Sequence, residues 1–170
     1  VTLEDFEHCD FIFSIGHNPG TNHPRMMTSL HNAAKRGATI IVMNPFKERA
    51  LQRFQAPQEP LEMATMTSVP IATTYFQVRI GGDAAALKGI CKALVDMDRA
   101  ARAADLAPVL DHDFISGHTS GFAEFVANLD QAQWADIERS SGLTHENLQD
   151  IARAYASAKA AIVSYGMGIT

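Results

Sequence analysis

The chain has 170 residues, with 14 basic against 19 acidic side chains and a formal net charge of −5, and this length predicts about one domain. Its 46% hydrophobic and 19% charged residues exclude intrinsic disorder, and the acidic balance without a Lys/Arg stripe argues against nucleic acid as a partner. We expect no membrane span, because no apolar run approaches ~18 residues. Two cysteines are too few for a disulfide framework, a four-thiolate zinc site or an iron–sulfur cluster, so the expected compartment is the cytoplasm.

The first third of the chain predicts a strand, a loop, a helix and a second strand. An apolar run at 10–16 ends in glycine, and the loop at 17–24 is dense in turn-forming residues. Apolar residues recur at helical spacing over 25–36, and Gly37 supplies the stop. A second apolar run follows at 38–44. This order is the βαβ unit of an open parallel sheet.

The remaining two thirds alternate in the same way after a proline-rich excursion at 55–74. We expect a third strand at 74–80, a helix with Asp83 as its N-cap, a helical excursion at 105–142, a helix at about 144–159 and a fourth strand at 161–166. The predicted fold is α/β: a single domain over 1–170 with a three-layer α/β/α, doubly wound, mainly parallel, Rossmann-like sheet. Because the chain stops just after an apolar run and a Gly-x-Gly, we expect a piece excised from a longer chain.

Glycine gathers where the predicted strands end. The four strand ends are residues 16–19, 44–46, 81–83 and 166–168, and three of them contain glycine. Ligands of doubly wound sheets bind outside the carboxyl ends of the strands, and glycine lets the backbone approach a ligand closely. The pattern favours a phosphate-bearing cofactor.

The spacing of the glycines narrows the choice of cofactor only in part. The segment Gly16-x-x-x-Gly20 fails the G-x-G-x-x-G dinucleotide fingerprint, and no P-loop is present. A carboxylate at Asp83 suits guanine, which presents two adjacent donors on one edge. The alternative, that Asp83 only caps its helix, is equally open.

Three segments together carry a resemblance to a known family. Residues 10–24 are similar to that family's strand followed by Gly-x-Asn-Pro and then His-Pro, residues 37–45 to its second strand, and residues 165–170 to its closing Gly-Met-Gly. In this order the chain resembles the molybdopterin oxidoreductases, closest to the formate-dehydrogenase-like alpha subunits, as an internal cofactor-binding domain. The departure is at 44–46, where Asn-Pro-Phe stands in place of Asp-Pro-Arg.

The resemblance implies binding of the guanine and pyrophosphate tail of molybdopterin guanine dinucleotide (bis-MGD). The first loop would follow the pyrophosphate, the second the nucleoside, the third guanine or ribose, and the last the pterin end. The cofactor-binding residues implied are Gly16, His17, Asn18, Pro19, Gly20, Thr21, Asn44, Pro45, Phe46, Lys47, Glu48, Gly81, Gly82, Asp83, Gly166, Met167 and Gly168.

The resemblance also implies what this chain lacks. The chain is expected to be part of a molybdenum oxidoreductase whose catalytic residues, molybdenum ligand and any iron–sulfur cluster lie outside it. On its own it is therefore expected to be inactive. Its expected partners are other domains of the same parent chain, while the substrate, the electron acceptor and the oligomeric state stay open.

We expect Cys9 and Cys91 to pack in the core, and His17, His23 and His31 match no compact metal pattern. The alternative function is a non-catalytic α/β nucleotide-binding or regulatory module.

Overall fold

The structure is a computed structural model that describes residues 1–167 and 169. It divides into two compact units, one formed by Val1–Val78 with Ser157–Thr170 and the other by Arg79–Ala156. Each unit is described by itself below.

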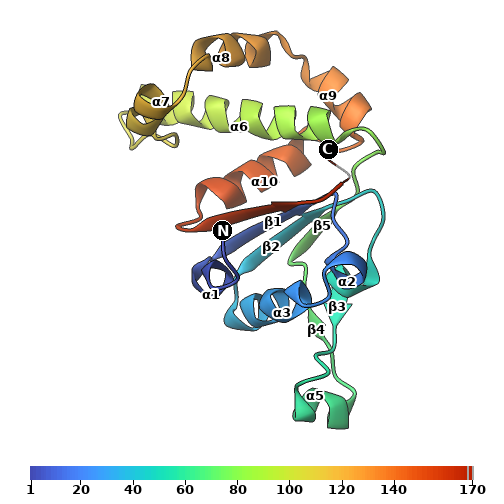
Figure 1. The fold of residues 1–170 in the computed structure, drawn as a ribbon. Helices are drawn as coiled ribbons and strands as arrows, with labels where there is room; N and C mark the ends of the chain where they lie inside the picture. The colour runs from blue at the N-terminus through green and yellow to red at the C-terminus, as the bar shows by residue number, and fades with distance from the viewer. Residues whose placement is uncertain (168, 170) are drawn as a thin grey trace. The chain divides into compact units, whose positions relative to one another are not determined.

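The first unit is built on a sheet of four parallel strands (Figure 1). These strands are β1 (Phe11–Ile15), β2 (Thr39–Met43), β5 (Thr74–Phe76) and β6 (Ala161–Tyr165). Their order across the sheet is β5-β2-β1-β6, with every neighbouring pair parallel. In chain order this is third, second, first, fourth, which is the order of one half of a doubly wound sheet. The prediction of an α/β fold with a mainly parallel sheet is confirmed.

A hydrophobic core cluster of this unit lies on one face of the sheet. Ile12, Ile40 and Ile162 are partners in register and are all buried, and the helix α3 (Met26–Arg36) adds Met27 and Leu30 to the same cluster. Burying each such side chain contributes about 1.5–3 kcal/mol. The continuous apolar runs of β1 and β2 are therefore those of buried strands, whereas β6 exposes Val163 and Tyr165.

The helix α1 (Asp5–His8) lies next to α3. Arg36, at the end of α3, donates from Nη2 to the backbone oxygens of Phe6 (2.8 Å) and Cys9 (2.9 Å), and so holds the end of α1. Cys9 is buried in the core cluster, as expected, and burial raises the pKa of its thiol.

The proline-rich segment forms a side arm of the same unit (Figure 1). It contains α4 (Arg49–Gln52), β3 (Arg53–Phe54), α5 (Pro60–Thr65) and β4 (Val69–Pro70), with β3 and β4 antiparallel. The buried Glu62 accepts from the Ala56 amide (3.0 Å) and pairs with His31 Nε2 (2.8 Å) and Lys35 Nζ (3.5 Å). Hydrogen bonding to Ala56 and His31 lowers the pKa of Glu62. His31 is therefore a buried hydrogen-bond partner of Glu62.

The second unit is entirely helical. It contains α6 (Asp83–Ala103), α7 (His112–His118), α8 (Phe122–Gln131), α9 (Trp134–Ser141) and α10 (His145–Ala156). The helix α6 packs against α8, α9 and α10, and the buried Asp98 accepts from the amides of Val109 and Leu110 and from His112 Nε2. The stretch expected as a helical excursion at 105–142 contains α7, α8 and α9. Across the described residues, no helix is both long and apolar enough to span a membrane.

The third strand is shorter than predicted. It was expected over 74–80 but ends at Phe76, because its neighbour β2 ends at Met43 and the Asn44 amide makes the last bond to Phe76 O (3.1 Å). Beyond this point the Arg79 amide donates to Ser141 O (2.7 Å), away from any strand.

Candidate functional site

The carboxyl ends of the four parallel strands share one edge of the sheet. The strand order reverses between β1 and β6, and ligands of such sheets bind at this switch point. Gly16 and Gly166 follow these two strands, and a Cβ on Gly166 would lie only 3.0 Å from Gly16 O. A larger residue at 166 would therefore push apart the two loops that follow β1 and β6. The backbones that follow β1 and β6 therefore approach each other closely at the switch point.

The loop after β1 is shaped by its own side chains. Asn18 caps the short helix α2 (Pro19–Asn22), since its Oδ1 accepts from the Thr21 amide (3.3 Å). His17 is buried, with Nε2 3.1 Å from His23 Nδ1 and Nδ1 3.4 Å from Ser164 Oγ. Burial, and next the neighbouring His23, lower the pKa of His17.

The loop after β2 is tied to the end of β5. The buried Asn44 donates from Nδ2 to Phe46 O (3.1 Å). The Tyr75 hydroxyl donates to Phe46 O (2.5 Å) and accepts from the Glu48 amide (3.1 Å), and burial raises its pKa. The Phe46 side chain is 66% exposed. The loop is therefore rigid in its backbone and presents an aromatic ring where the family resemblance implies arginine.

These two loops meet at a hollow of about 330 Å³ between α2 and α4. The helices approach closely because residue 20 is glycine: a Cβ there would overlap that of Ala50. Arg53 is held from the side by Ser68, whose Oγ accepts from Nε (2.9 Å). The residues that line the hollow are Asn18, Gly20, Thr21, Glu48, Arg49, Ala50, Arg53, Phe54 and Gln55.

Sequence reasoning placed four of these residues in the site, namely Asn18, Gly20, Thr21 and Glu48, and missed the basic ones. Arg49 and Arg53 are four residues apart on and beside α4, directly after the second strand end. Because α4 ends at Gln52 and Arg53 is extended, helical spacing does not bring the two side chains together. Their place just after the second strand end is the signal in the sequence that pointed to them.

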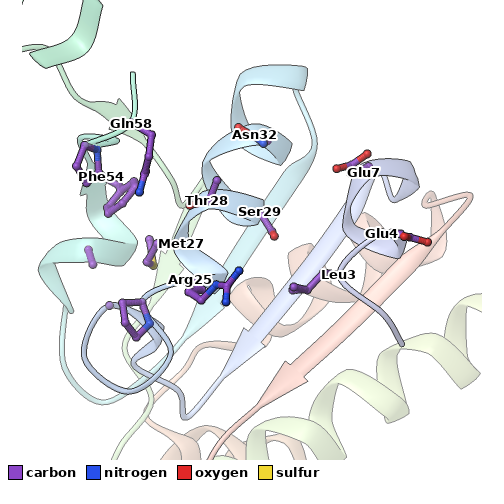
Figure 2. Close-up of a pocket in the computed structure, with 14 residues that line it drawn as sticks. Leu3, Glu4, Glu7, Arg25, Met27, Thr28, Ser29, Asn32, Phe54 and Gln58 are labelled. Atoms are coloured by element: carbon purple, nitrogen blue, oxygen red, sulfur yellow. The ribbon is translucent and has the colours of Figure 1, made fainter. Parts of the chain in front are cut away.

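A second hollow, of about 680 Å³, adjoins the first and shares Gly20, Ala50 and Phe54 with it. Figure 2 shows its lining side chains, with Arg25 at the start of α3 and the carboxylates of α1 on the far side. Its lining is mostly apolar and small polar groups. It therefore lacks the concentration of basic groups that distinguishes the first hollow.

Asp83 belongs to the helical unit, and one of its carboxylate oxygens lacks a hydrogen-bond partner among the described residues. Within the described part of the chain its Oδ1 is buried without a hydrogen-bond partner, and burial raises the pKa of the carboxyl. The predicted N-cap role is wrong, because α6 begins at Asp83 and the cap position is Gly82. The side chain is thus a buried acceptor with spare capacity.

The remaining predicted site residues divide between the two units. Residues 16–21, 44–48, Gly166 and Met167 follow strands at the shared edge of the sheet, whereas Gly81 and Gly82 precede α6. Gly168 lies outside the described residues. No cluster of three or more His, Cys, Asp or Glu side chains that could hold a metal ion occurs in residues 1–167 and 169.

Comparison with known proteins gives the chain relatives along its whole length. It is 52% identical over 170 residues to protein YdeP of Escherichia coli K12, and 33% identical over 170 residues to the oxidoreductase Rv2900c of Mycobacterium tuberculosis H37Rv; it spans 22% and 21% of these proteins. It is 25% identical over 168 residues to formate dehydrogenase H of E. coli K12, of which it spans 20%. No family model matches the chain.

A solved structure supports the fold. Acetylene hydratase from Pelobacter acetylenicus matches 94% of this chain and 18% of its own chain, with a TM-score of 0.70 at 18% sequence identity. The chain spans about a fifth of the length of the curated relatives. It is therefore similar, over its whole length, to one region of much larger oxidoreductases.

Proposed function

We propose that this chain is a cofactor-binding domain of a molybdenum-dependent, formate-dehydrogenase-like oxidoreductase, and that it holds the guanine dinucleotide tail of molybdopterin guanine dinucleotide. The proposal rests on the glycines that follow β1 and β6 at the switch point of the parallel sheet. There a Cβ on Gly166 would lie only 3.0 Å from Gly16 O. The similarity to formate dehydrogenase H over 99% of this chain supports the choice of cofactor.

The hollow between α2 and α4 fits the pyrophosphate. Asn18 and Thr21 offer polar groups from one side, and Arg49 and Arg53 offer guanidinium groups from the other. Planar guanidinium groups suit phosphate oxygens, with which they form charge-assisted hydrogen bonds. Glu48 is the acidic residue of the lining, so the two arginines leave it net positive. Arg49 would thus supply the charge that Phe46 lacks.

Asp83 fits the guanine base. Guanine N1–H and its exocyclic amino group donate side by side, and a carboxylate can accept both. A buried acceptor without a partner costs about 1–3 kcal/mol, and a ligand that donates to Asp83 Oδ1 would recover that cost. The raised pKa has the same origin, because burial disfavours the charged carboxylate until a donor is supplied.

The bound cofactor would supply two-electron chemistry at molybdenum. The part played by this chain is positioning: it grips the distant tail and so fixes where the reactive end lies. Gly166 and Met167 would approach the pterin end. Catalytic side chains, the molybdenum ligand and any iron–sulfur cluster are proposed to lie elsewhere in a longer parent chain, in which other domains are the partners of this one.

Titration of the chain with GDP, followed by NMR of its backbone amides, tests the proposal. GDP should shift the amides of residues 16–18, Gly20, Thr21 and Asp83, and ADP should shift only those of the first loop. Asp83→Asn replaces one acceptor by a donor, so it should weaken GDP binding about tenfold, as expected for one mismatched hydrogen bond. Asp96→Asn, an exposed carboxylate on the same helix, is the control and should bind as the natural chain does.

The same pair of variants separates the two roles that the sequence left open for Asp83. If the carboxylate stabilises α6, Asp83→Asn lowers the urea midpoint of unfolding. If it is a spare acceptor for a ligand, the midpoint stays or rises, because a buried unpaired charge is removed. GDP shifts confined to residues outside the strand ends would contradict the proposed function.

A further inference from the structure

His17 and His23 stand at the two ends of the first loop and contact each other. His17 directly follows Gly16, and His23 is the C-cap of α2. Between them lie only Asn18 and the four residues of α2, yet their rings are joined by the 3.1 Å contact from Nε2 to Nδ1, with ring centroids 5.1 Å apart. The pair therefore closes the loop into a ring of seven residues.

The inner member of the pair is anchored to the sheet. His17 is 7% exposed, and its second nitrogen, Nδ1, lies 3.4 Å from Ser164 Oγ on β6. A Cβ on Gly166 would meet His17 Cδ2 at 3.2 Å, so the glycine crossing makes room for this ring. Both ring nitrogens of His17 are thus engaged within the protein, which leaves neither free for a phosphate.

The hydrogen bond between the two rings has room for one proton between Nε2 of His17 and Nδ1 of His23. If the Nε2 of His17 donates, the Nδ1 of His23 must be unprotonated, and the reverse arrangement is equally good. When both imidazoles are cationic, two N–H groups face each other and the bond is lost. At least one ring must be neutral for the loop to stay closed.

We propose that the His17–His23 pair is a clamp that holds α2 and its cap Asn18 in the ligand-binding conformation, and that acid opens it. His17 and His23 act on the ligand through the loop, so they are positioning residues. The effect on a nucleotide rests on the proposed function, whereas the effect on the loop does not.

The groups around the clamp come from β6 and from the residues at the starts of α1 and α3. Ser164 from β6 faces His17, and Arg25, two residues after His23, brings a further positive charge at the start of α3. Leu3, just before α1, and Phe6 of α1 line one pocket with His23, and Glu4, the N-cap of α1, and Glu7 line the adjoining hollow with Arg25.

The direction of the pH effect follows from burial. Burial and the neighbouring His23 lower the pKa of His17 below its usual value of 6.5. A group whose pKa is lower in the folded chain contributes stability above its unfolded value and loses it as the pH falls. The clamp is therefore closed above 6.5 and opens as the pH falls through the lowered pKa of His17.

Amide hydrogen exchange in the ligand-free chain tests the clamp. The Thr21 and Asn22 amides donate to Asn18 O, and the His23 amide donates to Pro19 O, so all three report on α2. Their protection factors, corrected for intrinsic exchange, should fall about tenfold between about pH 7.5 and a pH below the lowered pKa of His17, the effect of losing one hydrogen bond. His23→Gln keeps a donor and an acceptor but does not titrate, so its protection should stay constant over this range. His118→Gln, on α7, is the control and should behave as the natural chain does.

Nucleotide binding gives the second readout. The affinity for GDP should fall with pH in the natural chain, in parallel with protection, and should be flat in His23→Gln. If added positive charge on the histidines simply attracted phosphate, affinity would instead rise on acidification, and the clamp would be refuted. Equal protection at both pH values in the natural chain would refute it as well. GDP that binds at neither pH overturns the proposed function, while the protection factors still decide the clamp.

Discussion

Replacing Gly20 by alanine tests the packing that creates the basic hollow. The new methyl group would lie well under 3.0 Å from the Cβ of Ala50, a separation that real Cβ atoms essentially never show. Both atoms are fixed to helix backbones, so no side-chain rotation relieves the overlap. Methyl groups in contact are about 3.5–4.0 Å apart, which means that α2 and α4 must separate by roughly 1 Å.

The expected cost is that of overpacking, about 1–3 kcal/mol of the free energy of unfolding. Residue 20 is not in the left-handed region, so backbone strain adds nothing to this cost. Alanine is in fact favoured over glycine in a helix by about 0.5–1 kcal/mol, which puts the net loss toward the lower part of that range. Parting α2 from α4 also separates Thr21 from Arg49, so GDP affinity should fall with stability.

Urea unfolding of a double-mutant cycle measures the effect. Ala50→Gly alone should cost about 0.5–1 kcal/mol through helix propensity. Combined with Gly20→Ala it moves the methyl group from one helix to the other, and the double variant should recover most of the lost stability. A Gly20→Ala chain that unfolds at the natural midpoint, or a cycle with additive free energies, would refute the close contact as the cause.

Three further predictions concern single groups in the sheet unit. Ser14 Oγ is buried with no hydrogen-bond partner among the described residues, so Ser14→Ala should raise the free energy of unfolding by about 1 kcal/mol, and a loss of stability in urea would contradict this. Asp10 accepts from the Lys159 and Ala160 amides, which lowers its pKa; stability should fall as the pH drops below its usual 3.8, and Asp10→Asn should remove that part of the acid dependence. Arg49→Gln should weaken GDP binding about five- to tenfold by removing a charge-assisted bond, measured by calorimetry, and an unchanged affinity would exclude Arg49 from the site.

The sheet was predictable because its central strands, β1 and β2, are buried on both sides. Continuous apolar runs at 10–16, 38–44 and 161–166 leave few alternatives to parallel strands, and the carboxyl ends of such strands meet at one edge. For the same reason Gly16, Asn44 and Gly166 could be assigned to one edge from local sequence alone. The length of β5 could not, because it depends on where its neighbour β2 ends.

The rest of the site depends on contacts between distant segments. The basic residues enter the hollow only because α4 packs against Gly20, and nothing local to residues 49–53 announces that contact. The histidine pair forms because a short helix turns the loop back on itself, which makes His17 a buried clamp residue. Likewise His31 and Glu62, 31 positions apart, form a buried pair that no spacing rule reveals.

The most direct measurement is the guanine nucleotide and molybdenum content of the full-length oxidoreductase that we propose carries this chain. Asp83→Ala should lower both contents together relative to the natural protein, while the matched Asp96→Ala protein should retain them. Full retention of nucleotide and metal after removal of the Asp83 carboxylate would contradict the assignment of this chain as the holder of the guanine tail.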